Sequence, residues 1–413
     1  MSRRDRYHAR MSANHDVVIV GGGLVGASLA IALGMQGRDV ALVEATPQGA
    51  MPPVFDQRNL SFAAATVNAL TALGVMAKLR SPGGMIRRIH VSRAGDFGRV
   101  KLDASDYGRQ AFGQVVVARD FGEALEARLA ELPSLTRYRP ARFIGLGDVD
   151  AERHAVRIAD AQGEHTISAR LLVAADGTTS GVRDALGIGT ARHDYRQTLF
   201  VARVRAEKAP DGTAWERFGD HGPTALLPRG DRHWGVVHGV DADQAETVAG
   251  LDEAAWLARL QEAVGWRATG RLLASGERSA YPIVRVVAER TTAPRAVLLG
   301  NAAQTLHPIG AQGFNLGLRD ALTLVEMAEQ AEDPGTAALL QAYAARRNED
   351  RERTLAFSDG LARVTANAAP LLRPLRSLGF VAADAVPSLQ SWLVGGAMGF
   401  RGDVPALCRE QAP

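Results

Sequence analysis

The sequence predicts an α/β protein with two unlike sheets, one parallel and covered by helices, the other mainly antiparallel. Short aliphatic runs that are apolar on both faces, at residues 16–20, 171–175 and 296–299, are typical of buried parallel strands. The runs at 199–205 and 233–238 alternate between apolar and polar residues, as strands with one solvated face do. Glycine supplies 43 of 413 residues, about 10% where roughly 7% is usual, which indicates many tight turns.

Composition excludes several classes of protein. Hydrophobic residues make up 46% and charged residues 23% of the chain, which excludes a mostly disordered protein. The 48 basic and 45 acidic residues leave a net charge of +3, so nucleic acid is not indicated as a partner. Cys408 is the single cysteine, which excludes an internal disulfide, a cysteine-metal cluster and a redox pair of thiols. The ten histidines show no metal-binding spacing, so no metal is expected.

The N-terminal residues 1–15 are polar and include four arginines. They lack the apolar core of a secretory signal, so we expect a cytoplasmic protein, and Met11 is an alternative to Met1 as the native start. No run reaches the roughly 20 apolar residues that a membrane-spanning helix needs.

The first predicted unit is a strand, a helix and a second strand joined through a glycine-rich turn. The apolar run at residues 16–20 leads directly into the turn at 21–26, and residues 27–37 have the composition of a helix. A second strand follows at 40–43, and Glu44 comes directly after it. This is a complete βαβ unit of about 30 residues, which predicts a Rossmann-type dinucleotide site.

Each glycine of this turn has an expected role. Gly21 permits the tight turn, Gly23 lets the backbone approach a pyrophosphate, and Gly26 allows the helix to pack on the strand. The helix N-terminus offers unpaired N–H groups to the phosphate. Glu44, 18 residues after Gly26, is placed to accept hydrogen bonds from a ribose diol. The motif alone does not distinguish NAD from FAD.

Two later turns follow apolar strands in the same way. The strand at 171–175 ends in Asp176-Gly177, which indicates a polar turn beside the cofactor crevice or an ordinary Asp-Gly turn. The strand at 296–299 leads into a glycine-rich segment, 300–317, and a helix predicted over 318–330. In this segment the Asn301 amide can bond a ribityl hydroxyl. Backbone N–H groups near Gln312, Gly313 and Phe314, before that helix, would favour negative charge on a reduced flavin ring.

The three segments, in this order, resemble the FAD-dependent aromatic hydroxylases related to para-hydroxybenzoate hydroxylase. Residues 300–308 are similar to the ubiquinone-biosynthesis hydroxylases of the UbiH/VisC type, especially 2-polyprenyl-6-methoxyphenol hydroxylases. Most of the superfamily has Asp and His where this chain has Asn301 and Gln304, whereas the ubiquinone group commonly has Asn and Gln. Three shorter stretches also match that group: Phe55–Arg58, Glu216–Phe218 and Gly222–Pro228. The resemblance covers residues 16–357.

The resemblance implies that FAD is held by turn glycines, carboxylates, amides and two arginines. These residues are Gly21, Gly23, Gly26, Glu44, Arg58, Arg119, Asp176, Gly177, Gly300, Asn301, Gln312, Gly313 and Asn315. Asp176 would lie near the pyrophosphate and Asn301 near the ribityl chain. Arg58 and Arg119 would reach the FAD, although a solvated surface charge remains the alternative for both.

The resemblance also places His307 and Pro308 at the reaction centre. The Pro308 carbonyl matches a position that accepts a hydrogen bond from a flavin hydroperoxide. His307 is either the base that deprotonates the phenol or a loop histidine satisfied by the protein. One difference from the ubiquinone group is Gly310-Ala311, where that group usually has Ala-Gly, so a methyl group is moved within the loop nearest the flavin.

The implied reaction is hydroxylation of the aromatic ring of a polyprenylated phenol, with NAD(P)H and O2, through a flavin C4a-hydroperoxide. The sequence holds no second G-x-G-x-x-G, so NAD(P)H is expected to dock only transiently. Three alternatives remain: an aromatic hydroxylase of a soluble phenol, a prenyl reductase of the same fold, or a flavin-binding scaffold subunit of a quinone-biosynthesis complex. Other quinone-biosynthesis proteins are the macromolecular partners expected.

We expect a discontinuous FAD-binding domain made of residues 1–79, 115–190 and 292–356. A substrate domain, whose sheet covers the flavin, would take residues 80–114 and 191–291. The remaining residues, 357–413, are expected to form a C-terminal helical segment.

Within that segment, residues 385–400 carry no charge. They predict either a helix packed on the body or a surface that contacts a membrane or a partner, which would place the protein peripherally at the inner membrane. We expect a mixed arrangement in which the first half of the stretch is packed, the Gly395-Gly396 pair breaks the helix, and residues 392–400 are exposed.

Overall fold

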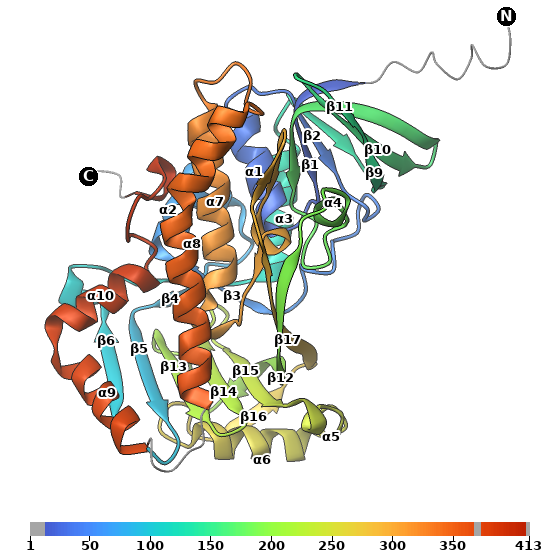
Figure 1. Cartoon of the computed structure of the whole chain (residues 1–413). Helices are drawn as coiled ribbons and strands as arrows, with labels where there is room; N and C mark the ends of the chain where they lie inside the picture. Colours follow the sequence, from blue (N-terminus) through green and yellow to red (C-terminus); the bar gives the residue numbers. More distant parts are fainter. Residues whose placement is uncertain (1–12, 367–372, 410–413) are drawn as a thin grey trace, which may run out of the picture.

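The computed structural model describes residues 13–366 and 373–409 (Figure 1). The proposed alternative start at Met11 lies outside the described residues. The fold is the predicted α/β architecture with one mainly parallel and one mainly antiparallel sheet.

The first sheet has the strand order β18-β19-β11-β1-β2-β8, and a β-meander extends it through β10 and β9. The contacts of β1 with β2 and β11, of β2 with β8 and of β11 with β19 are parallel. The strands are β1 (Asn14–Val20), β2 (Val40–Val43), β8 (Leu135–Tyr138), β9 (Ala141–Val149), β10 (His154–Asp160), β11 (Gly163–Ala174), β18 (Thr292–Ala293) and β19 (Ala296–Leu298). Val17 to Ile19 are fully buried, as expected of a central strand covered on both faces.

Four helices form the layer beside this sheet (Figure 1): α1 (Leu24–Met35), α3 (Ala118–Leu129), α7 (Gln312–Ala328) and α8 (Ala337–Ala366). Nine consecutive residues of α1, Gly26 to Gly34, are buried, because the helix lies against the sheet, α3 and α7. This central position fixes the N-terminus of α1 at the carboxyl edge of the sheet.

The second sheet has the order β20-β17-β12-β15-β14-β13-β5-β6, with β16 paired to β12. Its strands are β5 (Arg88–Arg93), β6 (Arg99–Asp103), β12 (Thr190–Ala206), β13 (Thr213–Gly219), β14 (Gly222–Pro228), β15 (Trp234–Asp241), β16 (Leu272–Ser275), β17 (Ser279–Ala288) and β20 (Gln304–Thr305). Helix α6 (Glu253–Val264) covers one face, where Trp256 and Leu260 pack on Phe200 and Val236.

A three-stranded sheet links the two bodies of the molecule, one built on the mainly parallel sheet and the other on the mainly antiparallel sheet. It consists of β3 (Asn59–Ala63), β7 (Gly113–Val117) and β4 (Gly84–Ile86), in the order β3-β7-β4. Helix α2 (Ala64–Ala72) follows β3 directly. Two short helices, α4 (Gly181–Ala185) and α5 (Ala245–Ala249), complete the connections.

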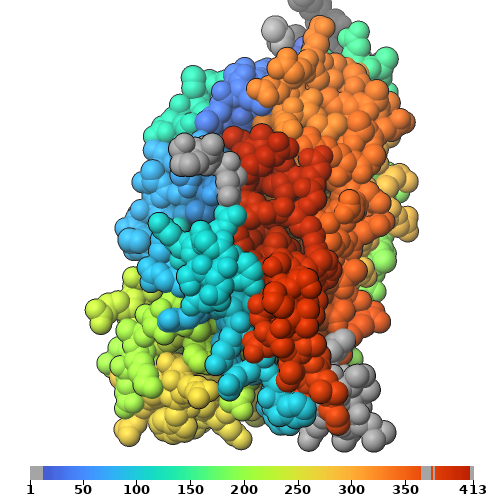
Figure 2. All heavy atoms as spheres, turned by 90° about the vertical axis from the view of Figure 1, so that its left-hand side faces the viewer, coloured from blue at the N-terminus to red at the C-terminus, as the bar shows by residue number. Residues whose placement is uncertain are grey.

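The C-terminal helices are α9 (Arg373–Ala385) and α10 (Pro387–Ala397). Figure 2 shows the atoms of this segment, in red, lying beside the cyan atoms, in agreement with the contact between α9 and β6. The expectation that Gly395-Gly396 breaks the helix is wrong. Helix α10 runs through both glycines, because Val394 and Met398, one turn apart, are buried against the core formed with β6 and β7. Trp392 is exposed, as predicted, but Val394 and Met398 are buried, whereas Val386 and Leu389 in the first half of the stretch are exposed. The predicted division into a packed first half and an exposed second half is therefore wrong.

Helix α7 begins at Gln312, six residues before the predicted start. Glycines at 313 and 317 favour a loop there, but Gly317 serves packing. A Cβ at Gly317 would lie 2.9 Å from the Val25 side chain and 3.1 Å from the Gly300 Cα. The glycine therefore lets α7 approach α1 and the turn after β19.

Candidate cofactor and substrate site

Gly21 and Gly26 are required by the fold of the first turn. Gly21 has φ +106°, and a Cβ there would lie 2.4 Å from the carbonyl oxygen of Ala175. A Cβ at Gly26 would lie 2.0 Å from the carbonyl oxygen of Gly21. These contacts bring the end of β1 against the end of β11 and seat α1 directly above both.

Gly23 has no such requirement. It is the N-cap of α1 with an ordinary extended backbone, φ −73°. In the described part of the chain, a Cβ there would meet only Val54, at 3.7 Å. No side chain caps this N-terminus, so the first N–H groups of a 12-residue helix are available to an anion.

Glu44 lies against the same turn. Its Oε2 accepts a hydrogen bond from the Gly22 N–H at 2.8 Å, and its Oε1 accepts one from the Thr46 N–H at 2.7 Å. Each carboxylate oxygen retains a second lone pair. The structure therefore places the carboxylate at the end of β2, beside the N-terminus of α1.

The turn after β11 is adjacent, since a Cβ at Gly21 would also lie 2.9 Å from the Asp176 Cα. The Asp176 carboxylate accepts hydrogen bonds from the Ser180 hydroxyl and, at 3.1 Å, from the Val182 N–H, which holds the turn that precedes α4. Gly177 has φ +88°, and no described atom lies within 4 Å of the place that a Cβ would take. The Asp176 side chain thus stabilises the turn, and the backbone at Gly177 remains open.

The turn after β19 carries Gly300 and Asn301. Gly300 has φ +57°, and a Cβ there would lie 3.0 Å from the Val25 side chain at the start of α1. Asn301 is exposed, and its side-chain amide has no hydrogen-bond partner among residues 13–366 and 373–409. A polar amide is therefore free at the edge where the other turns meet.

Arg183 joins two of these turns. Its Nη1 donates to the carbonyl oxygens of Thr178 and Ala302, both at 3.1 Å, and the residue is buried. The sequence marks this arginine only by its place shortly after Asp176-Gly177. Its partner at 302 lies 119 positions away along the chain, so the contact has no local signal.

The N-terminus of α7 supplies the other predicted cofactor residues. Its N-cap, Ala311, has a left-handed backbone, φ 52° and ψ 37°. Gln312 donates from Nε2 to the Gly310 carbonyl at 3.0 Å, and no described atom lies within 4 Å of a Cβ at Gly313. The first turn of α7 therefore leaves space at Gly313, as α1 does at Gly23.

The Asn315 side chain is saturated by the protein. Its Oδ1 accepts from the Ala63 N–H and the Thr66 hydroxyl, and its Nδ2 donates to the carbonyls of Ser61 and Ala311. All four bonds are 2.7–3.0 Å long. Asn315 thus holds α7 against β3 and α2, and any cofactor contact is left to its backbone.

Gln304 fixes the loop after β19 to two helices beneath it. Its Nε2 donates to Asp320 of α7 at 2.8 Å, and its Oε1 accepts from Arg351 of α8 at 3.0 Å. Asp320 pairs in addition with Arg347 of α8 at 2.7 Å. The position of the loop therefore depends on how α7 and α8 pack.

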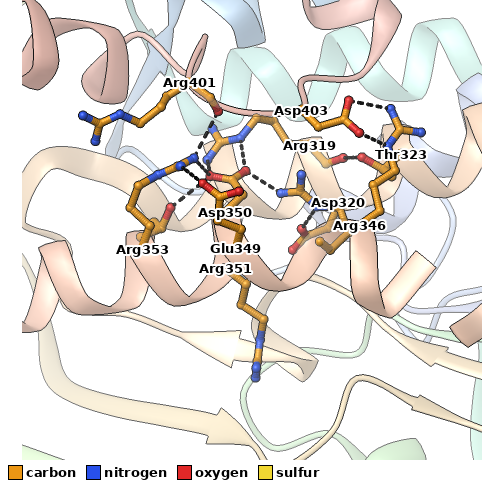
Figure 3. A network of polar contacts seen from close by, with 12 residues as sticks. Arg319, Asp320, Thr323, Arg346, Glu349, Asp350, Arg351, Arg353, Arg401 and Asp403 are labelled. Atoms are coloured by element: carbon orange, nitrogen blue, oxygen red, sulfur yellow. Dashed lines mark hydrogen bonds and ion pairs between the residues drawn. The ribbon is translucent and has the colours of Figure 1, made fainter. Parts of the chain in front are cut away.

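A buried ionic network continues from there between the same two helices. Asp350 of α8 pairs with Arg319 of α7 at 2.8 Å and with Arg347 at 2.5 Å (Figure 3). Burial alone would raise the pKa of Asp350, but the two arginines outweigh it and lower this pKa far below its usual value. The network joins α7 to α8 through charges that neutralise one another.

Arg58 is held by a cluster that the sequence does not predict. Its guanidinium forms a bidentate pair with Asp56 and stacks over the Tyr281 ring, 4.2 Å from the ring centroid. The Tyr281 hydroxyl donates to the same carboxylate. Burial would raise the pKa of Asp56, but the hydrogen bonds from Arg58 and Tyr281 lower it overall. A tyrosine of β17 and the 55–58 segment are thereby joined across the two bodies.

Arg119 lies at the start of α3 with its side chain 58% exposed. Its one ion pair within the described residues, to Glu123, is 3.6 Å long, and Glu123 also pairs with Arg80 at 2.7 Å. The Arg119 N–H donates to the Asp56 carbonyl at 2.9 Å. This places the backbone of Arg119 beside the 55–58 segment and leaves its guanidinium weakly paired.

His307 is buried, and the protein satisfies both ring nitrogens. Nδ1 accepts from the Ile309 N–H at 3.2 Å, so Nε2 carries the proton and donates to Gln197 at 3.3 Å. Burial lowers its pKa to about 4, although Asp359 raises it in part. The ring is neutral near pH 7 and offers no free lone pair, which favours the satisfied histidine over the base. Pro308 beside it is exposed.

Two hollows on the surface lie elsewhere. One, of about 850 Å³, is bounded by α2, β4 and the turns at 210–212 and 228–230. The other, of about 410 Å³, lies between β12, α6 and β17. Neither is lined by a predicted site residue, so the site is defined by its turns and helix ends.

The meeting point of these turns fits a dinucleotide. The space at Gly23 and the uncapped N-terminus of α1 suit a pyrophosphate, Glu44 suits a ribose diol, and the free Asn301 amide suits a hydroxylated chain. The open first turn of α7 suits a group that carries negative charge.

Comparison with known proteins points the same way. The family model described as "FAD binding domain" matches residues 14–358. The ubiquinone hydroxylase UbiL of Rhodospirillum rubrum is 33% identical over 390 residues, covering 93% of this chain and 89% of that protein. The 3-demethoxyubiquinol 3-hydroxylase of Escherichia coli is 30% identical over 400 residues, covering 93% and 98%.

Among solved structures, p-nitrophenol 4-monooxygenase PnpA from Pseudomonas putida has a TM-score of 0.79 with 19% identity. The match covers 95% of this chain and 99% of that one. At this identity the likeness shows the fold.

Proposed function

Because the chain belongs to the FAD binding domain family, we propose that it is an FAD-dependent monooxygenase of ubiquinone biosynthesis. The reaction is hydroxylation of the aromatic ring of a polyprenylated phenol, with NAD(P)H and O2 as co-substrates. The single observation that carries the cofactor is the uncapped N-terminus of α1 with free space at Gly23. The names of the two relatives support the substrate class.

When bound, FAD supplies electron transfer from NAD(P)H and the activation of O2. The protein binds the cofactor and orients it. The N–H groups at the start of α1 hold the pyrophosphate, Glu44 holds the adenosine ribose, and Asn301 bonds the ribityl chain. The N–H groups at Gln312 and Gly313 stabilise negative charge on the ring.

The remaining predicted residues have less direct parts in this proposal. Arg119, exposed and weakly paired, reaches the phosphates. Arg58 acts through the cluster with Asp56 and Tyr281. Pro308 borders the reacting centre with its carbonyl, and His307 keeps that loop in place through Ile309 and Gln197.

A glycine pair tests the cofactor site. Gly23→Val should abolish stoichiometric FAD binding, measured by flavin absorbance after gel filtration, while the circular dichroism spectrum stays unchanged. Gly360→Val, at an exposed position of α8 with no described atom near its Cβ, is the matched control and should bind FAD normally. Retained stoichiometric FAD in the Gly23 variant would refute the site.

The reaction is tested with the FAD-loaded protein, NADH or NADPH, O2 and 2-prenylphenol as a short-chain probe. Mass spectrometry should find a product that has gained one oxygen atom, and ¹⁸O2 should label it. Oxidation of NAD(P)H with a reduced prenyl chain and no oxygen gained would indicate the reductase instead. No turnover of either kind with bound FAD would favour the scaffold.

We further propose the predicted division of labour, in which the segments around the parallel sheet bind FAD and the antiparallel sheet forms the wall of the substrate site. The FAD-binding domain consists of residues 1–79, 115–190 and 292–356. The substrate domain consists of residues 80–114 and 191–291. Limited proteolysis tests the boundaries. Cleavage should concentrate near residues 190 and 292, and cuts spread evenly through 191–291 would contradict a separate substrate domain.

A surface for a lipid-tailed substrate is part of the proposal. Within residues 13–366 and 373–409, no helix combines the length and apolarity needed to cross a bilayer. Helices α9 and α10 nevertheless expose several large apolar side chains: Leu378, Val381, Val386, Leu389 and Trp392. We call these five residues the C-terminal apolar surface and propose that it contacts the face of a membrane, where a polyprenyl chain resides.

A further inference from the structure

The antiparallel sheet has two unlike faces. On the face covered by α6, the central strands bury large side chains such as Phe200 and Trp234, each 1% exposed. On the opposite face of the same strands, Val201 and Val237 are only half-buried. Aliphatic side chains left half-exposed on the inner strands of a nine-stranded sheet indicate that this second face borders accessible space.

The strand register places the Glu216 carboxyl group on that second face. Glu216 of β13 pairs with Ala225 of β14 and with Val91 of β5. Ala225 pairs in turn with Val237, and Val237 with Val201. Because directly paired residues share a face, this row across the sheet reads Val, Val, Ala, Glu, Val. Glu216 is its one ionisable member.

Two segments that belong to the candidate cofactor site border this face. Phe218, two residues after Glu216 and therefore on the same face, packs on Ile309, the residue after Pro308. At the other end, Tyr281 pairs with Leu199 on this face and holds the Asp56–Arg58 pair. Glu216 thus lies next to Phe218, on a face that is bordered by the residue after Pro308 and, four strands away, by Tyr281.

The Glu216 carboxyl group has no hydrogen bond or ion pair within the described residues. Burial raises its pKa to about 7, and no neighbouring charge contributes. Several charged and titratable groups on the elements that border this face are engaged with protein partners. They are Asp56, Arg58 and Tyr281; Arg93 with Asp220; Tyr195 and Arg363 with Asp359; and His307 with Gln197.

We propose that Glu216 accepts the hydroxyl proton of the phenol substrate. The inference rests on the proposed function and names the base of that same site. In the step, the phenol O–H bond breaks, its electron pair stays on the phenol oxygen, and the proton forms a new O–H bond on the Glu216 carboxylate. The ring of the resulting phenolate is more nucleophilic than that of the neutral phenol. The proton then returns to the oxygen of the product.

Other candidates for this base are already engaged with protein groups. The acceptor nitrogen of His307 is bonded to the Ile309 N–H. The Tyr195 hydroxyl donates to Asp359 at 2.9 Å, and burial raises the pKa of that tyrosine well above its usual value. A carboxylate that titrates near neutral pH is suited to exchange a proton with a phenol.

The test compares FAD-loaded wild type with Glu216→Gln and Glu216→Asp, using 2-prenylphenol as the probe. The control is Glu164→Gln, a residue 67% exposed on the β10–β11 hairpin. Wild type should gain kcat/KM for product formation as pH rises, with a midpoint of about 7. Glu216→Gln should lose this rise and lower kcat/KM by about 100-fold at alkaline pH, within the range for a general base. Glu216→Asp should recover part of the pH dependence.

A second readout does not need turnover. Difference infrared spectra of wild type against Glu216→Gln should contain a protonated-carboxyl band that disappears as pH rises through about 7. Absence of that band, or identical pH profiles of wild type and Glu216→Gln, overturns the assignment of Glu216 alone. Equal loss in the Gln and Asp variants at every pH would indicate a structural role and overturn it also. A wild type that binds FAD but never hydroxylates the probe refutes the proposed function itself.

Discussion

Two kinds of glycine stand at the meeting point of the turns. Gly21 and Gly26 are held by close backbone contacts, where a Cβ would lie 2.4 Å or less from a carbonyl oxygen. Gly23 and Gly313 have ordinary backbone angles and room for a side chain. The first pair is explained by folding alone. The second pair has no such steric requirement, and both glycines stand at helix N-termini, where a bound anion would use the space.

Asn301 gives the sharpest single-residue prediction for cofactor binding. Asn301→Leu should weaken FAD binding by about 1–3 kcal/mol, the cost of leaving a polar partner unsatisfied. Asn301→Asp should be tolerated, since Asp also accepts from a ribityl hydroxyl. Because the Asn301 amide has no protein partner among the described residues, neither change should alter the stability of the FAD-free protein. Titration of apoprotein with FAD measures the affinity, and equal affinity in wild type and the leucine variant would remove Asn301 from the site.

Ala311 predicts a stabilising change. Its φ of 52° is a left-handed conformation, which costs an L-residue roughly 1–2 kcal/mol. Glycine removes that strain but gives back about 0.4–1 kcal/mol of freedom in the unfolded chain. Ala311→Gly should therefore raise the free energy of unfolding by about 0.5–1 kcal/mol, measured by urea denaturation.

The control is Ala342→Gly, on the exposed face of α8. There the same substitution should lower stability by about 1 kcal/mol, because the backbone is helical. A lower urea midpoint for Ala311→Gly would show that the methyl group has a packing role in the loop.

At the level of elements, the sequence pattern predicts those helices and strands whose bounds depend on neighbouring residues in the chain. The β1–α1–β2 unit follows from its apolar runs and glycines, and the predicted bounds of β2, 40–43, are the observed ones. The predicted start of α7 is late, because Gly317 reads as a helix breaker but is required by contact with Gly300 and Val25. A contact between residues far apart leaves no periodic signal, so sequence patterns miss this boundary.

The ionic network between α7 and α8 is another feature that no local pattern reveals. The family resemblance singles out Gln304, yet its partners Asp320 and Arg351 lie 16 and 47 residues away. Once helices α7 and α8 are packed, these side chains meet in a buried layer beneath the loop. The network thus fixes the position of the loop once α7 and α8 have packed together.

Removing one acid of this network should be strongly destabilising. Asp350 is 7% exposed and pairs with Arg319 and Arg347, each 3% exposed. Asp350→Ala would leave two buried guanidinium groups with too few partners, at a cost of about 3–5 kcal/mol. Glu349→Ala is the neighbouring control: Glu349 is 81% exposed, so its pair with Arg353 should contribute about 0–1 kcal/mol.

The difference in stability between wild type and Asp350→Ala, measured as the gap in urea midpoint, should depend on pH. The pKa of Asp350 is lowered in the folded state, because its arginine partners outweigh burial. A lowered pKa gives stability that is present above the unfolded value and is lost as pH falls through the folded one. The gap in urea midpoint should therefore be constant at neutral pH and narrow only below about pH 4. A gap that narrows near neutral pH would contradict this pairing.

The molecule as a whole combines two bodies whose residues meet at one place. The parallel sheet contributes the turns after β1, β2, β11 and β19, and these can be predicted because each follows its own apolar strand. The face of the antiparallel sheet that bears Glu216 and Tyr281 cannot be assigned from the sequence. Alternation gives two faces to a strand, and only the packing of α6 on one of them identifies the other as the face toward the cofactor site.

The C-terminal apolar surface provides the prediction that concerns the whole molecule. Helix α10 turns Leu389 and Trp392 outward, 37% and 52% exposed, while Val394 and Met398 are buried. Replacing the two outward residues by serine should leave the fold and FAD content unchanged, because neither lies in the core. Flotation with anionic phospholipid vesicles should recover wild type but not Leu389→Ser with Trp392→Ser, and activity on the short-chain probe should be equal. Trp266→Ser, at a site 62% exposed and outside this surface, is the control and should float as wild type does. Equal flotation of all three proteins, or flotation of none, would mean that this surface does not contact a membrane.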